Sequence, residues 1–270
     1  MTSFDQIESL IVKLGDWACE EQKGIFRDYK EDGSVLTKAD TTINEQVANL
    51  LKKLFPEANV VTEEALFPYA ESAPYTFILD PIDGTDAYSQ GSPAWCVSLG
   101  ILDENKKICG GMVYAPRWGR ARAEGLMLRR DPNKNLLLNG KKHTNRIENK
   151  NLEQFSMPSH THHFIAFKPH NAKVRSFGSN ILHMISPLLY PNTQGGISIN
   201  CFVWDIAGSH ALIDADGFEI SYHDGSPFIY TEDLLKERKQ IKKILTYGTK
   251  EALPTIQNLV NDAYYNYLNQ

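Results

Sequence analysis

One acidic stretch of the chain combines residue types that suit metal chemistry. Residues 80–86 read Asp-Pro-Ile-Asp-Gly-Thr-Asp and follow an apolar run at Tyr75 to Leu79. The run predicts a strand, and Pro81 biases Asp80 towards extended backbone, so we expect this strand to end with a carboxylate at its tip. Asp83 supplies a second carboxylate nearby. Oxygen ligands alone favour Mg²⁺ over zinc, which prefers His or Cys.

The second half of this stretch is suited to receive a phosphate. Gly84 has no side chain to block a ligand, and the N–H groups of Gly84, Thr85 and Asp86 would be unpaired donors at the start of a helix. An isolated Asp-Gly-Thr is more often only a tight turn. The stretch also resembles the Asp-x-Asp-Gly-Thr box of haloacid-dehalogenase-type phosphatases, whose first Asp is a nucleophile. Asp80 and Asp83 lie three positions apart rather than two, so that geometry is not reproduced.

Acidic residues elsewhere in the chain could complete the site. Glu63 and Glu64 end a β-branched run, and because alternate strand residues face opposite sides, at most one is expected to point at the site. A solvated loop is the simpler interpretation of this pair alone. Asp205 stands where a predicted helix opens, in Trp-Asp-Ile-Ala-Gly at 204–208, and an ordinary N-cap is the competing interpretation there.

The hydrophobic spacing predicts the elements that must bring these acids together. Two helices are expected first, one behind a Ser3/Gln6 capping box and one opened by a Thr42/Glu45 capping box and stopped by Pro56. A run of strands, including one hairpin, is expected next, and later helices return to cover them. The predicted strands are Asn59–Val61, Tyr75–Leu79, Cys96–Leu102, Ile108–Tyr114, Arg120–Arg130 and Asn135–Asn139, and the later helices are Gly178–Leu189, Asp205–Ala215 and Glu251–Leu268.

The composition is that of an ordinary globular protein. The chain has 270 residues, of which 42% are hydrophobic and 23% charged. No repeat or linker divides it, so we expect a single domain over residues 1–270 that mixes helix and sheet, with any subdomain division near Asn145 to Gln154. The net charge of −5 and the lack of a basic stripe argue against a nucleic-acid partner.

The cysteines and the apolar runs indicate where the protein works. Its four cysteines show neither the close pairing of a zinc site nor the density of a secreted disulfide scaffold, so a reducing compartment fits them. We recognise no signal peptide at the N-terminus, and no apolar run approaches the ~20 residues of a membrane span. We therefore expect a cytoplasmic protein with no membrane partner.

Taken together and in this order, the acidic motifs resemble those of a known family. The pair Glu63-Glu64, the hexamer at 80–85 and Trp-Asp-x-Ala-Gly at 204–208 look like the three signature boxes of the inositol monophosphatase family of Mg²⁺-dependent, lithium-sensitive phosphomonoesterases. Segments at 37–40, 139–141 and 175–179 are similar to others in that family. The resemblance implies a layered αβαβα sandwich of the inositol monophosphatase and fructose-1,6-bisphosphatase type, and a homodimer.

The resemblance also implies a role for each residue of the site. Glu63, Asp80 and the carbonyl of Ile82 would hold one Mg²⁺; Asp80, Asp83 and Asp205 would hold a second, and Glu63 could share a third. Asp40 and Thr85 would position the attacking water, with Gly84, Thr85 and Asp86 around the phosphate. This arrangement would gather five carboxylates in one cleft, those of Asp40, Glu63, Asp80, Asp83 and Asp205. Their negative charges repel a phosphate monoester, so two or three Mg²⁺ must lie between the acids and the substrate for the substrate to bind.

The residues expected to recognise the alcohol differ from the family pattern. Inositol-specific relatives carry an acidic residue before the Trp204 box, whereas this chain offers Ser198 and Asn200; Arg175 is a further candidate, and Asp86 adds an acid near the phosphate. We therefore predict hydrolysis of several small phosphate monoesters. The alternatives are a 3'(2'),5'-bisphosphate nucleotidase or sugar-bisphosphatase of the same superfamily, and a catalytically silent protein that binds metal or phosphate.

Two other polar segments have simpler interpretations. His160, His162 and His163 could suggest a metal site, but no acidic partner lies near them in the sequence, so an exposed strand or loop at the cleft mouth is favoured. The basic segment Lys236–Lys243 is expected to be the solvated side of an amphipathic element. Lys38 is as well explained by a surface position as by a contact with phosphate.

Overall fold

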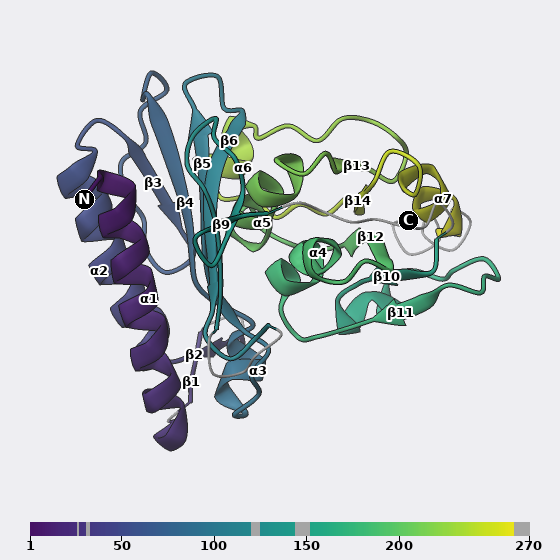
Figure 1. The fold of residues 1–270 in the computed structure, drawn as a ribbon, viewed down its shortest axis with the longest axis horizontal. Helices are drawn as coiled ribbons and strands as arrows, with labels where there is room; N and C mark the ends of the chain where they lie inside the picture. Colours follow the sequence, from purple (N-terminus) through teal and green to yellow (C-terminus); the bar gives the residue numbers. More distant parts are fainter. Residues whose placement is uncertain (26, 31–32, 120–124, 144–151, 262–270) are drawn as a thin grey trace.

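The chain folds into alternating layers of helix and sheet. The structure is a computed structural model that describes residues 1–25, 27–30, 33–119, 125–143 and 152–261. Helices α1 (Ser3–Glu21) and α2 (Lys38–Leu54) cover one face of a seven-stranded sheet, and α4 (Asn180–Leu189) and α5 (Trp204–Asp214) cover the other (Figure 1). A five-stranded sheet and then α7 (Leu253–Leu259) complete the stack. The αβαβα sandwich implied by the resemblance is confirmed.

Each sheet comes from one part of the chain. The seven-stranded sheet has the order β3-β4-β5-β6-β7-β8-β9, with only β3 and β4 parallel, and the five-stranded sheet has the order β11-β10-β12-β14-β13. The first consists of β3 (Asn59–Thr62), β4 (Tyr75–Asp83), β5 (Cys96–Asp103), β6 (Ile108–Ala115), β7 (Leu126–Arg130), β8 (Leu137–Leu138) and β9 (Lys141–Lys142), and the second of β10 (Gln154–Ser156), β11 (Lys173–Arg175), β12 (Thr193–Ser198), β13 (Glu219–Tyr222) and β14 (Leu245–Gly248). The short elements are η1 (Gln22–Gly24), β1 (Asp28–Tyr29), β2 (Val35–Leu36), α3 (Thr85–Ser89), η2 (Ser159–His163) and α6 (Glu232–Leu235).

The first two helices begin earlier than the sequence predicts. The capping box of α1 is formed by Thr2 and Asp5 instead of Ser3 and Gln6. That of α2 is formed by Thr37 and Asp40, five residues before the predicted Thr42/Glu45 box. Both alternatives fit the capping pattern, and the earlier start is selected because Thr37 and Asp40 are buried against the rest of the molecule, where their hydrogen bonds are shielded from water.

Close packing of α5 on the large sheet determines where the helix lies. A Cβ added to Gly100 of β5 would lie 2.5 Å from the Cβ of Ala207, and one added to Gly111 of β6 would lie 2.8 Å from that of Ala211. Glycine on the strands and alanine on the helix therefore allow the two backbones to approach closely. As a result, the first turn of α5, which carries Asp205, is held beside the end of β4.

The other predicted elements differ from the structure at their ends, whereas the strands of the five-stranded sheet, β10 to β14, are not among the predicted elements. Helix α7 ends at Leu259 because Val260 pairs with Phe167 in a β-bridge, and the predicted continuation through 262–268 lies outside the described residues. Of the predicted strand Arg120–Arg130, residues 120–124 are likewise not described, and β7 starts at Leu126. Among the described helices, none has the length and apolar character needed to cross a membrane.

Candidate active site

The acidic stretch lies at the end of β4, where the strand becomes irregular. The strand continues to Asp83 instead of ending near Leu79, but its pairing with β5 shifts register between Asp80 and Asp83. Pro81 has no N–H to donate, so it fits an irregular part of the ladder. Gly84 then turns the chain with φ of 91°, and a Cβ there would lie 2.9 Å from the carbonyl oxygen of Ala94.

Three carboxylates meet at this point. Asp80, Asp83 and Asp205 each offer an oxygen within 4.8 Å of the others. The carboxylate of Asp83 accepts hydrogen bonds from the hydroxyl of Ser179 and from the N–H of Ile181 at 2.7 Å. Asp80 is 1% exposed, and its Oδ1 has no hydrogen-bond partner in the part of the chain that the structure describes. Burying a carboxylate oxygen without a hydrogen-bond partner costs folding free energy, unless a bound ligand such as a metal ion interacts with that oxygen.

Burial and crowding act on the ionisation of these acids. Burial raises the pKa of Asp80 well above its usual range, and the negative charges of Glu63, Asp83 and Asp205 raise it further. Burial likewise raises the pKa of Asp205 well above normal. The pKa of Asp83 is raised to about 6 by burial, against the hydrogen bonds that stabilise its charged form. A divalent cation among the carboxylates would favour their ionised forms.

The donor set fits Mg²⁺. Every candidate ligand is an oxygen, several are carboxylates, and Asp80 of the cluster has a buried Oδ1 with no hydrogen-bond partner among the described residues. Cys96, whose sulfur lies 4.0 Å from Oδ2 of Asp83, is a buried thiol, and burial raises its pKa well above the usual range, so it does not supply a thiolate. The residues that could hold the ion are thus the three aspartates, with Glu63 and the Ile82 carbonyl as the further predicted ligands.

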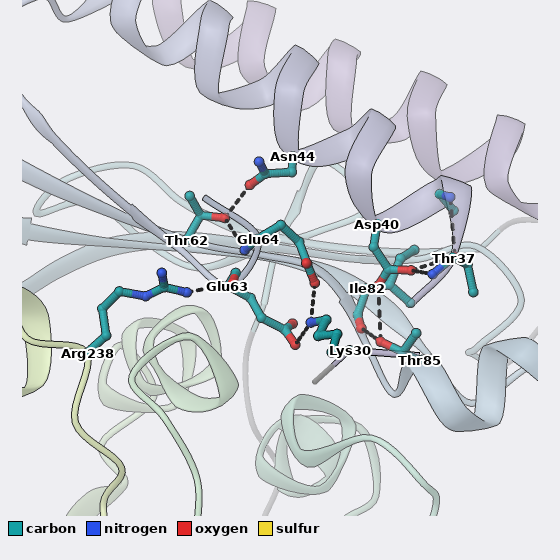
Figure 2. A network of polar contacts seen from close by, with 11 residues as sticks. Lys30, Thr37, Asp40, Asn44, Thr62, Glu63, Glu64, Ile82, Thr85 and Arg238 are labelled. Carbon is teal, nitrogen blue, oxygen red and sulfur yellow. Dashed lines mark hydrogen bonds and ion pairs between the residues drawn. The ribbon is translucent and has the colours of Figure 1, made fainter. Parts of the chain in front are cut away.

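Both glutamates after β3 are turned towards one lysine. The Nζ of Lys30 lies 2.7 Å from Oε1 of Glu63 and 2.6 Å from Oε1 of Glu64 (Figure 2). The negative charge of Glu63 raises the pKa of Asp80, and the negative charge of Asp40 raises the pKa of Glu64. Both carboxylates therefore turn to the same side, towards Lys30, although strand alternation predicts that at most one points at the site. Sequence reasoning did not find Lys30, because nothing in its local sequence distinguishes it from a surface lysine.

Asp40 joins the start of α2 to the acidic stretch. Its Oδ2 accepts a hydrogen bond from the N–H of Thr37 at 2.8 Å, and its Oδ1 accepts one from the hydroxyl of Thr85 at 3.1 Å (Figure 2). The same hydroxyl lies 2.9 Å from the carbonyl oxygen of Ile82. Burial raises the pKa of Asp40 to about 6. This places a carboxylate and a hydroxyl next to the predicted metal ligands, where they could orient a water molecule.

A cavity of about 170 Å³ opens beside Asp205. It is bordered by residues from η2, α4 and the segment before α5, namely Pro158, Ser159, His160, Gly178, Asn180, His183, Ile199, Asn200, Cys201 and Asp205. Burial lowers the pKa of His160 and lowers that of His183 to about 3, so both imidazoles are neutral near pH 7. Apart from Asp205, the cavity wall is therefore uncharged and combines polar residues with the apolar Pro158, Ile199 and Cys201.

Of the three predicted recognition residues, one borders this cavity. Asn200 lines it, with φ of 50°. Ser198 is fully buried, and its hydroxyl donates to Oδ1 of Asn180 at 2.9 Å, so Asn180 stands at the wall in its place. Arg175 is not among the lining residues, and its Nε donates to Gln154. Asn180 was missed because its role depends on α4 packing beside α5, which no local pattern shows.

The structure also places the other polar residues singled out in the sequence, namely Asp86, the three histidines at 160–163 and Lys38. Asp86 is exposed and accepts a hydrogen bond from Gln90, so its carboxylate lies at the surface. His160 borders the cavity, as expected for a residue at the cleft mouth, whereas His162 and His163 are exposed and not part of its lining. The Nζ of Lys38 lies 2.9 Å from Glu21, which supports the surface interpretation.

The prediction of a solvated basic segment is wrong at one position. Arg238 donates from Nη2 to the carbonyl oxygen of Glu63 at 2.6 Å, and its guanidinium carbon lies 4.9 Å from the centre of the Trp204 ring. The pattern of charges alone could not separate this arginine from the exposed lysines around it. It faces inwards because the turn after α6 carries it against the end of β3 (Figure 2).

Comparison with known proteins identifies the family. The model of the "Inositol monophosphatase family" matches residues 8–255. The chain belongs to the inositol monophosphatase family. One relative is the fructose-1,6-bisphosphatase/inositol-1-monophosphatase of Thermotoga maritima. It is 32% identical to this chain over 96 residues, and the alignment covers 36% of this chain and 34% of the relative. Another is the histidinol-phosphatase of Mycobacterium tuberculosis, 25% identical over 213 residues, 73% of this chain and 78% of the relative.

Solved structures show the same fold. The Thermotoga maritima IMPase superposes with a TM-score of 0.78 at 20% identity, covering 100% of this chain and 98% of that one. An IMPase/NADP phosphatase complexed with Mg²⁺ and phosphate gives a TM-score of 0.74 at 19% identity, covering 95% of each chain. The alignments with the first two curated relatives span only about a third of their length, 34% and 32%. The family and its fold are thereby established for this chain.

Proposed function

We propose that this family member hydrolyses small phosphate monoesters with the help of Mg²⁺. The observation that carries the proposal is the cluster of Asp80, Asp83 and Asp205, which offer oxygens within 4.8 Å of one another. Within the described part of the chain, the buried Oδ1 of Asp80 also has no hydrogen-bond partner. The cluster lies beside the Asp40–Thr85 pair and a cavity large enough for a small alcohol. Metal ligands, a water-orienting pair and a cavity are the parts that phosphate hydrolysis requires.

The chain's own residues would bind and orient the reactants. Asp80 would contribute to both metal positions, Glu63 and the Ile82 carbonyl to the first, and Asp83 and Asp205 to the second; a third metal would share Glu63. When bound, Mg²⁺ would neutralise the negative charge of the phosphoryl oxygens and lower the pKa of a water molecule that it holds.

Around the bound metals, the Asp40–Thr85 pair would hold the attacking water. Thr85 would orient it through its hydroxyl, and Asp40, with a pKa near 6, would accept hydrogen bonds from that hydroxyl and from the water. The backbone N–H groups of Gly84, Thr85 and Asp86 would point at the phosphate.

The cavity supports a broad substrate range. Asp205 is the one carboxylate among its lining residues, and the metals would occupy it, so no other carboxylate of the wall could bind the hydroxyl groups of a substrate. We therefore propose that Asn200 and Asn180 contact the alcohol weakly, and that the phosphate and the metals supply most of the binding energy. Relatives carry names with different substrates, among them a histidinol-phosphatase and a structure of an IMPase/NADP phosphatase bound with D-inositol-1-phosphate.

Further properties are proposed from the fold and the family. One hydrophobic core contains residues of both sheets, which supports a single domain despite the change of sheet between Lys142 and Gln154. The four cysteines form no disulfide, which supports a cytoplasmic location. We also propose a homodimer and inhibition by lithium on the basis of family membership. Light scattering after size-exclusion chromatography tests the first of these two.

Phosphate release from a substrate panel tests the proposed function. We would supply Mg²⁺ and compare inositol monophosphate, histidinol phosphate, fructose 1,6-bisphosphate, 2'-AMP and adenosine 3',5'-bisphosphate. Asp205→Asn should lower hydrolysis strongly, and Asp214→Asn, a change at the surface end of the same helix, should not. Absence of hydrolysis on every substrate would instead favour a binding protein, and one of the relatives is named Nus factor SuhB.

A further inference from the structure

Arg238 occupies an unusual turn next to the acidic site. Its φ of 54° lies in the left-handed region, which a residue with a side chain adopts only when its surroundings hold it there. The following residues provide that hold: the N–H of Ile241 donates to the carbonyl of Cys201 at 2.8 Å, and the side chain of Gln240 donates to that of Asn200 at 2.9 Å. The turn is thus fastened to the segment that leads into α5.

The guanidinium of Arg238 touches two parts of the site at once. Nη2 donates to the backbone carbonyl of Glu63 at 2.6 Å, and the group lies over the ring of Trp204, with its carbon 4.9 Å from the ring centre. Trp204 in turn stacks on Phe202, with ring centres 4.7 Å apart and an angle of 5° between the planes. One planar cation therefore joins the end of β3 to the start of α5.

These two contacts lead directly to two acids of the site, Glu63 and Asp205. Glu63 is the residue whose carbonyl Arg238 binds, while its carboxylate stays directed at Lys30 and the site. Asp205 follows Trp204 in the chain, and its Oδ2 accepts a hydrogen bond from the N–H of Phe202 at 2.5 Å. Movement of the Phe202–Trp204 pair or of the Glu63 backbone would change the separation between the two carboxylates.

We propose that Arg238 is a positioning residue that fixes Glu63 relative to Asp205 and thereby sets the affinity of the acidic cluster for a divalent cation. This inference rests on the proposed function, because it takes the cluster to be a metal site. Arg238 binds a carbonyl and not a carboxylate, so it orients the ligands without occupying their charged oxygens. Lysine cannot replace it fully, since an ammonium group cannot lie flat on Trp204 and reach the Glu63 carbonyl in the same way.

Metal binding to the complete, metal-free protein tests this role. The probe is Mn²⁺, which takes the same oxygen ligands as Mg²⁺, and its free concentration is followed by electron paramagnetic resonance. Arg238→Met retains the apolar stem and removes the hydrogen bond, and Arg238→Lys retains the charge. Lys242→Met is the matched control, because Lys242 is an exposed base of the same segment.

The expected result is a selective loss of metal affinity. Arg238→Met should weaken Mn²⁺ binding by about 10- to 100-fold, the range seen when a group that orients metal ligands is removed, and should raise the Mg²⁺ concentration needed for half-maximal activity by a similar factor. Arg238→Lys should recover only part of this loss, and Lys242→Met should bind Mn²⁺ like the unaltered protein.

Two outcomes would overturn the inference, and a third concerns the proposed function. If both Arg238 variants melt at lower temperature but bind Mn²⁺ with unchanged affinity, the arginine is purely structural. If Arg238→Lys is equivalent to the unaltered protein, charge alone explains its effect. Should the unaltered protein bind no Mn²⁺, or bind it as well after Asp80→Asn, the metal site itself is refuted, and with it the basis for a positioning role.

Discussion

Replacing Asp80 by asparagine should stabilise the metal-free protein while removing its ability to bind a cation. Asp80 is almost completely buried among other acids, and no described hydrogen bond to its side chain would be lost by the change. Asparagine has nearly the same shape but no charge. The substitution therefore isolates the electrostatic repulsion that the site contains when no metal is bound.

The size of the gain follows from the spacing of the carboxylates. Two unit charges separated by the 4.8 Å that bounds this cluster repel by about 3 kcal/mol at an effective dielectric constant of ~20. Asp83, with a pKa raised to about 6 by burial, is mostly ionised at pH 7.5, so at least its repulsion with Asp80 is relieved. For a chain of this length, about 3 kcal/mol corresponds to a rise in melting temperature of roughly 6 to 12 °C.

The pH dependence of this gain has a defined sign. Because the folded-state pKa values of Asp80, Asp83 and Asp205 are raised, the folded protein binds more protons than the unfolded chain in mildly acidic solution. The metal-free protein should therefore lose stability as the pH rises through about 6. The advantage of Asp80→Asn should be largest above pH 7 and shrink as the pH falls towards 4.

Thermal melting in excess EDTA measures the effect. Asp28→Asn, at an exposed position with no described side-chain contact, serves as the control and should melt like the unaltered protein. Addition of Mg²⁺ should raise the melting temperature of the unaltered protein by mass action and leave that of Asp80→Asn unchanged. A metal-free Asp80→Asn protein that is less stable than the unaltered one at pH 7.5 would refute the reasoning.

Four further predictions follow from the site and the core. Excess EDTA should abolish phosphate release and Mg²⁺ should restore it, with lithium inhibiting at millimolar concentration; undiminished turnover in EDTA would exclude a metal-dependent reaction. Asp205→Asn should lower turnover by on the order of 10²-fold or more, while Glu64→Gln should be mild; a large loss of turnover in Glu64→Gln together with a harmless Glu63→Gln, measured by steady-state kinetics, would show that Glu64 is the ligand. His210 is half-buried and its pKa is lowered to about 4 by burial, so the protein should lose up to ~3 kcal/mol relative to His210→Phe between pH 6.5 and 4, measured by urea unfolding; equal slopes for the two proteins would contradict this. In the substrate panel, kcat/KM values should fall within about two orders of magnitude of one another, and a preference beyond a thousandfold for inositol monophosphate would show that recognition uses residues not identified above.

The elements with regular apolar spacing could be predicted from the sequence. The strands at 75–79, 96–102 and 108–114 and the hairpin between the last two are confirmed, because β-branched and aromatic runs bounded by turn residues have few alternative structures. The residues at which the first two helices start could not be predicted in the same way. The Thr37 and Thr42 boxes both satisfy the same local rule, and the choice between them depends on which threonine is buried by the tertiary fold.

The site could be predicted only where its residues lie close together in the sequence. The hexamer at the end of β4 and the box at the start of α5 carry recognisable patterns, and the structure brings their aspartates together. Lys30, Asn180 and Arg238 carry none, since each reaches the site through the packing of distant elements. A charged residue in a polar segment looks the same in the sequence whether it faces solvent or a buried carbonyl.

The origin of the acids in distant parts of the chain has a kinetic consequence. Asp83 and Asp205 lie 122 positions apart, so the cluster of Asp80, Asp83 and Asp205 exists only after the late helix α5 has packed on the sheet that contains β4. If these segments are not yet packed together in the folding transition state, the transition state lacks the cation site that the native state contains. A divalent cation should therefore slow the unfolding of this protein and leave its folding rate unchanged, so that the lifetime of the native state, and not the ease of reaching it, depends on the metal concentration.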